Sequence, residues 1–265
     1  MTIQNGGQVA VGGTLKLWKA DSLVTVSGGT LAVGTLSGST GTVRITDPAG
    51  GPALTTGSAA SDAFSGTLCD DTAPGSLTKI GSGTQTLAWG GITYTGPTTV
   101  EEGALTLADA SAFASAIHND ATTEFSVSMG TGALATALGG AGTFVKSGDG
   151  TLIVAGPQDY DVGALFDVRG GTVVLQTDAG NQGADLSISV TGAELDFACD
   201  QHLDTLRIGD GGKVVFAGAH VVVLNDLVMD GFDFGATTPT PEPTTMGLLA
   251  LGGLAVMWGH RRRRS

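Results

Sequence analysis

Residues 75–107 read GSLTKIGSGTQTLAWGGITYTGPTTVEEGALTL and contain the pattern that decides the fold. Three short segments of this stretch have the composition of β-strands, at 77–80, 85–89 and 98–107. Glycine-rich corners separate these segments, and glycine adopts the positive φ that a tight corner needs. The stretch therefore predicts strands that follow one another closely around sharp corners.

The same plan returns at residues 142–175. Leu77, Lys79 and Gly81 correspond to Phe144, Lys146 and Gly148. The alignment of the two copies shifts by one residue between the first and the second half of the repeat, around Tyr94 and Tyr160. Self-similarity at a fixed interval is the sequence signature of a repeat architecture.

A smaller unit recurs more often than the long repeat. It consists of two glycines, any residue, an aliphatic residue, any residue and an apolar residue, and it occurs at 6–11, 12–17, 28–33, 170–175 and 211–216. Alternating apolar residues point to one face of a strand. Strands and corners stacked in this way form a solenoid, with layers of roughly 20 residues. The fold class that we expect is all-β.

The intervals between the clear repeats are less regular. Residues 108–118 (ADASAFASAIH) and 132–138 have the only patterns of short helices before the tail, and the interpretation of 108–141 is a linker or a helical insertion. Residues 37–74 are expected to form a layer with a protruding loop, because turn residues cluster at 47–52.

Composition excludes several classes. The chain has 44 glycines in 265 residues but no Gly-x-y period, which excludes collagen. Residues 1–238 hold eight basic and 24 acidic residues, so the body has a net charge of −16. An acidic body argues against nucleic-acid binding and suits an exported protein that attracts divalent cations. Cys69 and Cys199 lie far apart in sequence, and we expect them to be unpaired.

Residues 237–265 form a tail of different composition. A stiff Pro/Thr linker occupies 237–245, an uncharged apolar segment follows at 246–258, and four arginines end the tail. The apolar segment is predicted to be a short transmembrane helix, with the arginines on the cytoplasmic side and the body outside. Its residues are Met246, Gly247, Leu248, Leu249, Ala250, Leu251, Gly252, Gly253, Leu254, Ala255, Val256, Met257 and Trp258, and the basic cluster is Arg261, Arg262, Arg263 and Arg264.

The first repeat resembles the autotransporter-associated β-strand repeat. The resemblance rests on LTK-x-G-x-G-T at 77–84, Tyr-Thr-Gly at 94–96, Val100, and Gly-x-Leu at 103–105. The copy at 142–175 departs from the pattern, since it has Ser147 in place of an apolar residue and lacks the Tyr-Thr-Gly. The resemblance implies a parallel β-helix that is exported to the cell surface, and it implies no enzymatic activity.

The tail is similar to the PEP-CTERM sorting signal. Pro241, Glu242 and Pro243 match the motif for which the signal is named, and the apolar segment and terminal arginines follow in the expected order. The resemblance implies an exosortase as partner, passage through the inner membrane, and a setting rich in exopolysaccharide. The alternative is an ordinary tail anchor, which also places the body outside the cell.

The N-terminal residues show no secretory signal peptide, because repeat units begin at once. An exported protein needs such a signal, so a start placed too late is the interpretation that we favour. The alternative is a gene fragment without a function.

No catalytic, cofactor or metal site is predicted. Asp149 and Asp210 lie between glycines and are expected at corners rather than in calcium turns. An enzyme of the polysaccharide lyase or hydrolase type requires a base or paired carboxylates. The candidates are Arg169 and Arg207 with Asp167, Asp196, Asp200 or Asp204, and 200–204 is the densest polar cluster because it adds His202. His118, His202 and His220 are isolated in the sequence and have no metal-ligand spacing.

The sequence thus predicts three regions: a β-solenoid at 1–236, a Pro/Thr linker at 237–245, and a sorting helix with its arginine cluster at 246–265. The leading hypothesis is a non-enzymatic structural or adhesive surface protein, with the flat strand faces or loops 47–62 and 108–131 as its working surface. Exopolysaccharide or another surface protein is its expected partner. The alternative is a carbohydrate-active β-helix enzyme.

Overall fold

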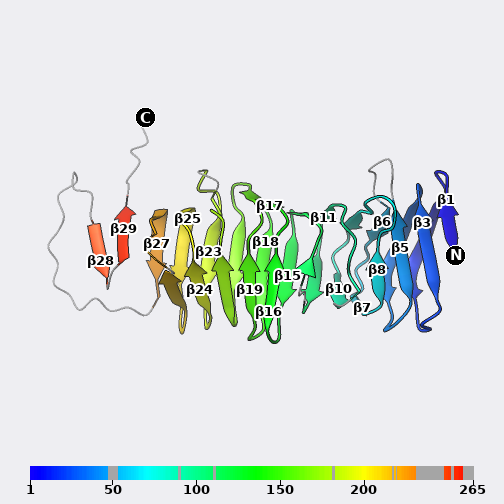
Figure 1. Cartoon of the computed structure of the whole chain (residues 1–265), viewed down its shortest axis with the longest axis horizontal. Coiled ribbons are helices and arrows are strands. Elements are labelled where there is room, and N and C mark those ends of the chain that lie inside the picture. Colours follow the sequence, from blue (N-terminus) through cyan, green and yellow to red (C-terminus); the bar gives the residue numbers. More distant parts are fainter. Residues whose placement is uncertain are drawn as a thin grey trace.

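The computed structural model describes residues 1–46, 53–88, 91–109, 112–180, 183–216, 218, 220–230, 248–251 and 254–258. It shows an elongated, all-β parallel solenoid of about ten turns, with its strands stacked along one long axis (Figure 1). No helix occurs in these residues. The prediction of a parallel β-helix is therefore confirmed for the body of the chain.

The strands of the solenoid belong to four sheets, and a turn in its middle contributes one strand to each of three of them, as β14 (Ile117–Asn119), β15 (Thr122–Ser126) and β16 (Thr131–Leu134) do. The first, in spatial order, holds β1 (Thr2–Gln4), β3 (Leu23–Ser27), β5 (Thr42–Thr46) and β8 (Thr67–Cys69). The second holds β2 (Gln8–Lys16), β4 (Thr30–Ser37), β6 (Leu54–Thr56), β9 (Leu77–Lys79), β11 (Thr98–Val100), β14 (Ile117–Asn119), β17 (Leu138–Gly140) and β20 (Gln158–Tyr160). We call this eight-stranded sheet the second face.

The two remaining sheets extend toward the C-terminal end. The third face runs through β7 (Asp62–Phe64), β10 (Thr84–Ala88), β12 (Ala104–Ala108), β15 (Thr122–Ser126), β18 (Thr143–Ser147), β21 (Leu165–Val168), β23 (Ser187–Val190), β25 (Gln201–Ile208) and β27 (Val222–Met229). The fourth face runs through β13 (Ala112–Phe113), β16 (Thr131–Leu134), β19 (Thr151–Val154), β22 (Thr172–Leu175), β24 (Glu194–Phe197) and β26 (Lys213–Phe216).

Strand register gives the length of a turn. Five residues of the second face stack directly on one another at intervals of 19 to 21 residues, namely Leu77, Thr98, Ile117, Leu138 and Gln158. This spacing agrees with the layers of roughly 20 residues that the glycine-rich unit predicts. Each strand alternates between buried and partly exposed residues, as β19 does with Leu152 and Val154 inside.

Aromatic residues stack inside the middle turns. The rings of Phe125 and Phe144 are nearly parallel, with centroids 6.3 Å apart, and Phe166 continues the stack 6.2 Å from Phe144. The ring of Tyr160 approaches Phe144 at 5.4 Å. Because neighbouring turns bury the same column of apolar surface, each turn depends on its neighbours for its core.

The two copies of the long repeat lie on different faces. Lys79 is in β9 on the second face, whereas Lys146 is in β18 on the third. The strands that follow, β10 and β19, are displaced by one face in the same way. The 67 residues between the two lysines therefore correspond to about three turns and a third, so the motif fits more than one side of the solenoid.

The two predicted helices are wrong. Residues 108–118 include β13 and the start of β14, and 132–138 includes most of β16 and the start of β17. Phe113 and Ile117 are buried, as are Leu134 and Leu138. In each pair the two residues point inward from either side of a corner, which places them four positions apart. One face of a helix has its buried residues at the same spacing, so the pattern is easily mistaken for a helix. Residues 108–141 are thus solenoid turns rather than an insertion.

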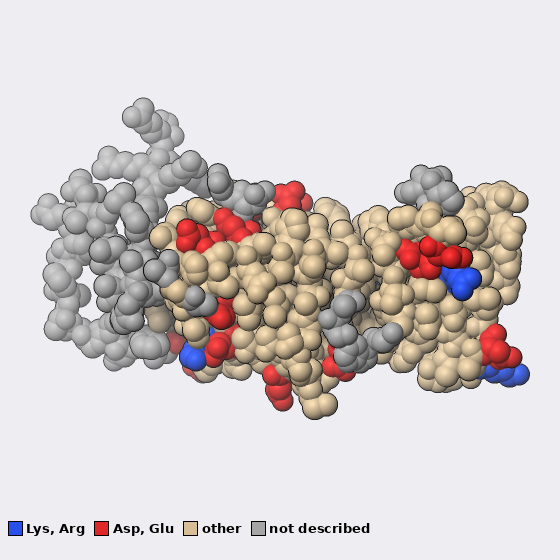
Figure 2. All heavy atoms as spheres, viewed as in Figure 1, with Lys and Arg blue, Asp and Glu red and all other residues tan. Residues whose placement is uncertain are grey.

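Residues 37–74 also form layers, as predicted, through β5 to β8; the turn cluster at 47–52 lies outside the described residues. The surface of the solenoid body carries few basic side chains. Figure 2 shows separate acidic patches on the side in view. Cys69 and Cys199 are both free, so the expectation of unpaired cysteines is confirmed.

The apolar tail segment has a different backbone from the predicted one. Residues Leu248–Leu251 form β28 and Leu254–Trp258 form β29, which pair with each other antiparallel, and β29 continues the third face beside β27. The predicted transmembrane helix is therefore not confirmed. A search of the described residues for a helix long and apolar enough to cross a membrane finds none.

Candidate functional site

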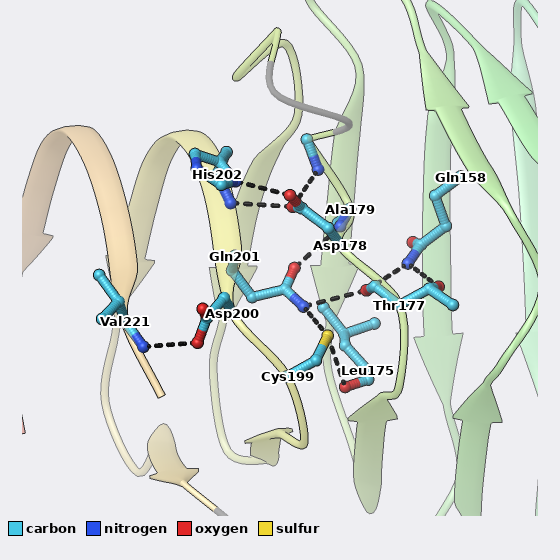
Figure 3. Close-up of polar contacts among 11 residues, drawn as sticks. Gln158, Leu175, Thr177, Asp178, Ala179, Cys199, Asp200, Gln201, His202 and Val221 are labelled. Carbon is cyan, nitrogen blue, oxygen red and sulfur yellow. Dashed lines mark hydrogen bonds and ion pairs between the residues drawn. The ribbon is translucent and has the colours of Figure 1, made fainter. Parts of the chain in front are cut away.

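A surface groove of about 510 Å³ lies at the corner that follows the fourth face in three successive turns. Its lining consists of Gln176, Thr177, Asp178, Cys199, Asp200 and His220. We call it the polar groove. Figure 3 shows the residues around it, which come from the turns after β22 and β24 and from the approach to β27.

Buried amide side chains hold the floor of the polar groove. Gln158 and Gln201 are almost wholly buried, and each donates a hydrogen bond of 3.0 Å to the carbonyl of Thr177. The Thr177 hydroxyl donates in turn to the Gly156 carbonyl at 2.7 Å, and the Gln201 carbonyl oxygen accepts from the amide of Ala179. A buried polar group is stable only when it is hydrogen-bonded, so this network fixes the corner rigidly.

Asp178 holds His202 in one orientation (Figure 3). One carboxylate oxygen lies 2.6 Å from His202 Nδ1, and the other accepts the backbone N–H groups of His202 at 2.9 Å and Gly180 at 3.1 Å. A proton on Nδ1 leaves Nε2 of a neutral imidazole with its lone pair free. Asp178 and His202 therefore have the relationship of an orienting carboxylate and a base.

A second acid–histidine pair borders the groove. Asp200 accepts the backbone N–H of Val221 at 2.9 Å, and its carboxylate lies 3.5 Å from His220 Nδ1. The side chain of Asp200 is 63% exposed and that of His220 is 25% exposed. The groove thus presents two carboxylates and the imidazole of His220, with His202 held beside it by Asp178, a set that can hydrogen-bond to a polar ligand such as a sugar.

The Cys199 thiol in this groove is a poor nucleophile. Burial raises its pKa, and the negative charges of Asp178 and Asp200 raise it further, against the opposing effect of the Gln201 amide that donates to Sγ at 3.0 Å. Because the thiolate is the reactive species, a raised pKa leaves the thiol inert near neutral pH. The raised pKa argues against a Cys–His nucleophile of the protease type at this position.

The structure separates most of the sequence-based enzyme candidates. Arg169 pairs with Asp167 at 2.6 Å, and Arg207 pairs with Asp230. Asp204 accepts hydrogen bonds from Ser187 and Asn225, outside the polar groove. Asp196 lies on the outer side of the fourth face, between Val174 and Val215. Only Asp200 and His202 belong to the groove region.

The histidines are not isolated, contrary to the sequence-based interpretation. His118, His202 and His220 each lie beside an aspartate, at 3.2, 2.6 and 3.5 Å. Asp178 is the residue that sequence reasoning missed, and it precedes His202 by 24 positions. Strand register supplies the signal, since a separation of about one turn brings two residues side by side.

The predicted corner positions of Asp149 and Asp210 are confirmed. Both residues lie in bends or turns between strands, and the Gly212 N–H closes the turn around Asp210 by donating to the Gly209 carbonyl at 2.9 Å. The sorting residues Pro241, Glu242 and Pro243 and the cluster Arg261–Arg264 lie outside the described residues.

Comparison with known proteins identifies two short regions. Residues 77–107 match the passenger-associated-transport-repeat family, and residues 239–264 match the PEP-CTERM protein-sorting motif. No curated protein matches the chain, and no solved structure does. The chain is thus a β-solenoid that carries a passenger-associated-transport repeat in its body and a PEP-CTERM sorting motif at its C-terminal side.

Proposed function

We propose that this chain is a non-enzymatic structural or adhesive protein of the cell surface, released from or held at the inner membrane after an exosortase acts on its tail. The sorting motif at 239–264 carries the proposal, because it implies export and recognition by an exosortase. The motif follows a solenoid body, an architecture that displays a long, regular surface.

The polar contacts of the body support a structural role. Most of the described candidates for acid–base chemistry form ion pairs or hydrogen bonds with neighbouring side chains. Arg169 pairs with Asp167, and Arg207 pairs with Asp230. The partly buried thiol of Cys199 has a raised pKa. Long stacked strands with partly buried threonines and serines on their outer side, such as Thr84, Thr106 and Ser126, present hydroxyl groups to a partner. Exopolysaccharide or another surface protein is the partner that we propose.

Mass spectrometry of the C-terminus tests the sorting step. Protein is recovered from the surface and the medium of the native cell, together with a variant in which Pro241, Glu242 and Pro243 are all alanine. A Pro239→Ala variant is the matched control, since it removes a proline outside the Pro241–Pro243 triplet. We expect the wild-type and control chains to end near Pro243, and the triple variant to keep the peptide with Arg261–Arg264. A wild-type chain that keeps this peptide in the membrane fraction makes the tail a plain anchor and refutes processing.

Binding to polysaccharide tests the adhesive role separately. The processed chain is sedimented with the insoluble exopolysaccharide of the native cell, and a heat-unfolded sample serves as the control. Retention of the folded chain alone is the expected result. Equal amounts in the pellet with and without polysaccharide contradict adhesion to it, whatever the outcome for the tail.

The polar groove favours one second candidate, a carbohydrate-active enzyme. Asp178 orients His202 at 2.6 Å, and Asp200 lies in the same groove, so a base and a further carboxylate are present. Wild-type protein is assayed on acidic and neutral polysaccharides beside Asp178→Asn and His202→Gln variants. Activity that both variants lose establishes the enzyme, whereas an inactive wild-type chain excludes it for those substrates.

A further inference from the structure

Three ligand-bearing side chains converge on the second face, outside the lining of the polar groove. His118 is in β14, Asp120 follows that strand directly, and Asp161 directly follows β20. Although Asp161 is 43 positions beyond His118, the imidazole nitrogen and one oxygen of each carboxylate all lie within 4.8 Å of one another. We propose that His118, Asp120 and Asp161 bind a divalent transition metal of the Zn²⁺ class.

Strand register explains how side chains two turns apart can meet. Strand β17 lies between β14 and β20, and its Gly139 pairs with His118 on one side and with Asp159 on the other. A Cβ atom at position 139 would lie only 2.4 Å from the Asp159 carbonyl oxygen, so this position accepts no side chain. Ala141 is the next outward residue of the same turn. The intervening turn therefore offers no long side chain to separate the two ligand-bearing turns.

The charges at this position favour a cation. The carboxylates of Asp120 and Asp161 carry like charges at close range, and among the described residues no lysine or arginine forms an ion pair with either. The imidazole of His118 also lies beside Asp120, with its Nε2 3.2 Å from Oδ2. Like charges repel at this separation, and a bound divalent ion turns the repulsion into attraction.

The observed distance fits a small metal ion. Ligand atoms about 2.0 Å from a tetrahedrally coordinated Zn²⁺ lie about 3.3 Å from each other. His118 Nε2 and Asp120 Oδ2 are 3.2 Å apart before any ion is added. One carboxylate oxygen of Asp161 lies within 4.8 Å of both atoms, and rotation of this exposed side chain shortens that distance. Both strands belong to one continuous sheet, which holds the ligand positions rigidly.

The ligand types select the class of metal. Ca²⁺ and Mg²⁺ prefer sites built from oxygen atoms alone. An imidazole nitrogen with two carboxylates suits Zn²⁺ and neighbouring transition metals. The side chains of His118 and Asp120 are 55% and 47% exposed, so water or a ligand from a partner completes the coordination. This inference rests on the geometry of the body alone and is independent of the sorting tail and of the adhesive role.

Isothermal titration of the full-length chain with ZnCl₂ tests the proposal. Wild-type protein is compared with His118→Ala and Asp161→Asn variants, after circular dichroism has shown that all three have the same strand content. We expect each variant to lose one Zn²⁺ equivalent or to bind it at least about tenfold more weakly, since loss of even an outer partner of a metal ligand costs that much. A thermal melt gives a second readout, because a ligand that binds only the folded chain raises its melting temperature.

A His220→Ala variant is the matched control. His220 also lies beside an aspartate, at 3.5 Å from Asp200, but it belongs to no group of three ligands within the described residues. Its loss is expected to leave Zn²⁺ binding unchanged. If wild type and His118→Ala bind Zn²⁺ equally, or if neither binds it, the proposal is wrong and His118 is only the ionic partner of Asp120. Displacement of Zn²⁺ by Ca²⁺ in about hundredfold excess overturns the choice of metal class.

Discussion

Lys79 and Lys146 make the same three hydrogen bonds on two different faces of the solenoid. Each ammonium group donates to the carbonyl of the next residue at 2.8 Å, to the carbonyl of the following glycine at 2.7 Å, and to a carbonyl of the next turn at 3.0 Å. The following glycines, Gly81 and Gly148, both have positive φ, which turns their carbonyls toward the lysine. The lysine of the repeat therefore closes a corner and joins it to its neighbour.

Replacement of either lysine is expected to be costly. Lys79 is 2% exposed and Lys146 is fully buried. A Lys→Met substitution therefore leaves three carbonyl oxygens without their hydrogen-bond donor, at a position that water does not reach. We expect the free energy of unfolding, from denaturation in urea, to fall by about 2–4 kcal/mol for each variant. Lys213→Met is the matched control, since Lys213 forms an exposed pair with Glu194, and its effect is expected within about 0.5 kcal/mol. Equal changes in unfolding free energy at the three positions would show that the hydrogen bonds of Lys79 and Lys146 stabilise the fold no more than an exposed ion pair does.

Alkaline pH is expected to destabilise the fold through its two tyrosines. Tyr94 and Tyr160 are the only tyrosines of the chain, and burial raises the pKa of both phenols above the ordinary value near 10. Their contribution to stability is complete below about pH 10 and is lost as the pH rises further, because the unfolded chain ionises first. The free energy of unfolding is expected to fall by up to about 1.4 kcal/mol per tyrosine for each pH unit.

The measurement follows unfolding free energy and tyrosinate absorbance over the same pH range. The control is a Tyr94→Phe and Tyr160→Phe double variant, in which the downward slope above pH 10 disappears. Burial lowers the pKa of Lys79 and Lys146, and these lysines act in the opposite direction below about pH 10.5. The difference between wild type and the double variant isolates the tyrosines. Tyrosinate absorbance that appears near pH 10 while the chain is still folded would contradict the prediction.

Gly180 is expected to be essential to the polar groove. A Cβ atom at this position would lie 1.4 Å from the His202 carbonyl oxygen, and the Gly180 N–H donates to Asp178. Gly180→Ala is therefore expected to separate Asp178 from His202 and to cost about 2 kcal/mol or more of unfolding free energy. Nuclear magnetic resonance of the His202 ring detects the displacement. Gly12→Ala, where nothing lies near the added atom, is expected to change stability by no more than about 0.5 kcal/mol.

The two thiols are expected to behave as unpaired cysteines, with Cys199 slow to react. A Cys69→Ser variant leaves Cys199 as the only thiol. Because burial raises the pKa of Cys199, its alkylation in the folded chain is expected to be slow at neutral pH and to accelerate only above about pH 9. Denatured protein is the control and is expected to react fully without a reductant. Rapid alkylation of the folded variant at neutral pH would show a thiolate and reopen the groove to nucleophilic chemistry.

The solenoid was predictable because its signal is local. Glycine corners and alternating apolar residues around Leu77 and Lys79 specify strands and turns within one short segment. The helices predicted around Phe113–Ile117 and Leu134–Leu138 failed because inward residues on either side of a corner have the same spacing as one face of a helix. A continuous count of residues per turn across this region distinguishes the two structures.

The candidate sites were much less predictable. The Asp178–His202 pair and the His118–Asp161 approach join residues one or two turns apart, so they depend on the register of every strand between them. A change of one residue in a corner shifts the partner to another position or another face. The sequence alone gives the residue types, such as the 200–204 cluster, but their neighbours follow only from the stacked turns.

The stacking of turns in a single column also determines how the body responds to a pulling force. Neighbouring strands are about 4.8 Å apart, whereas a released turn of about 20 residues extends to roughly 70 Å. Tension applied from the C-terminal side reaches β29 first and then β27, because each turn is bonded only to its neighbours. The body therefore lengthens by one turn at a time while the remaining turns stay folded, and it absorbs mechanical work in small steps rather than failing at once.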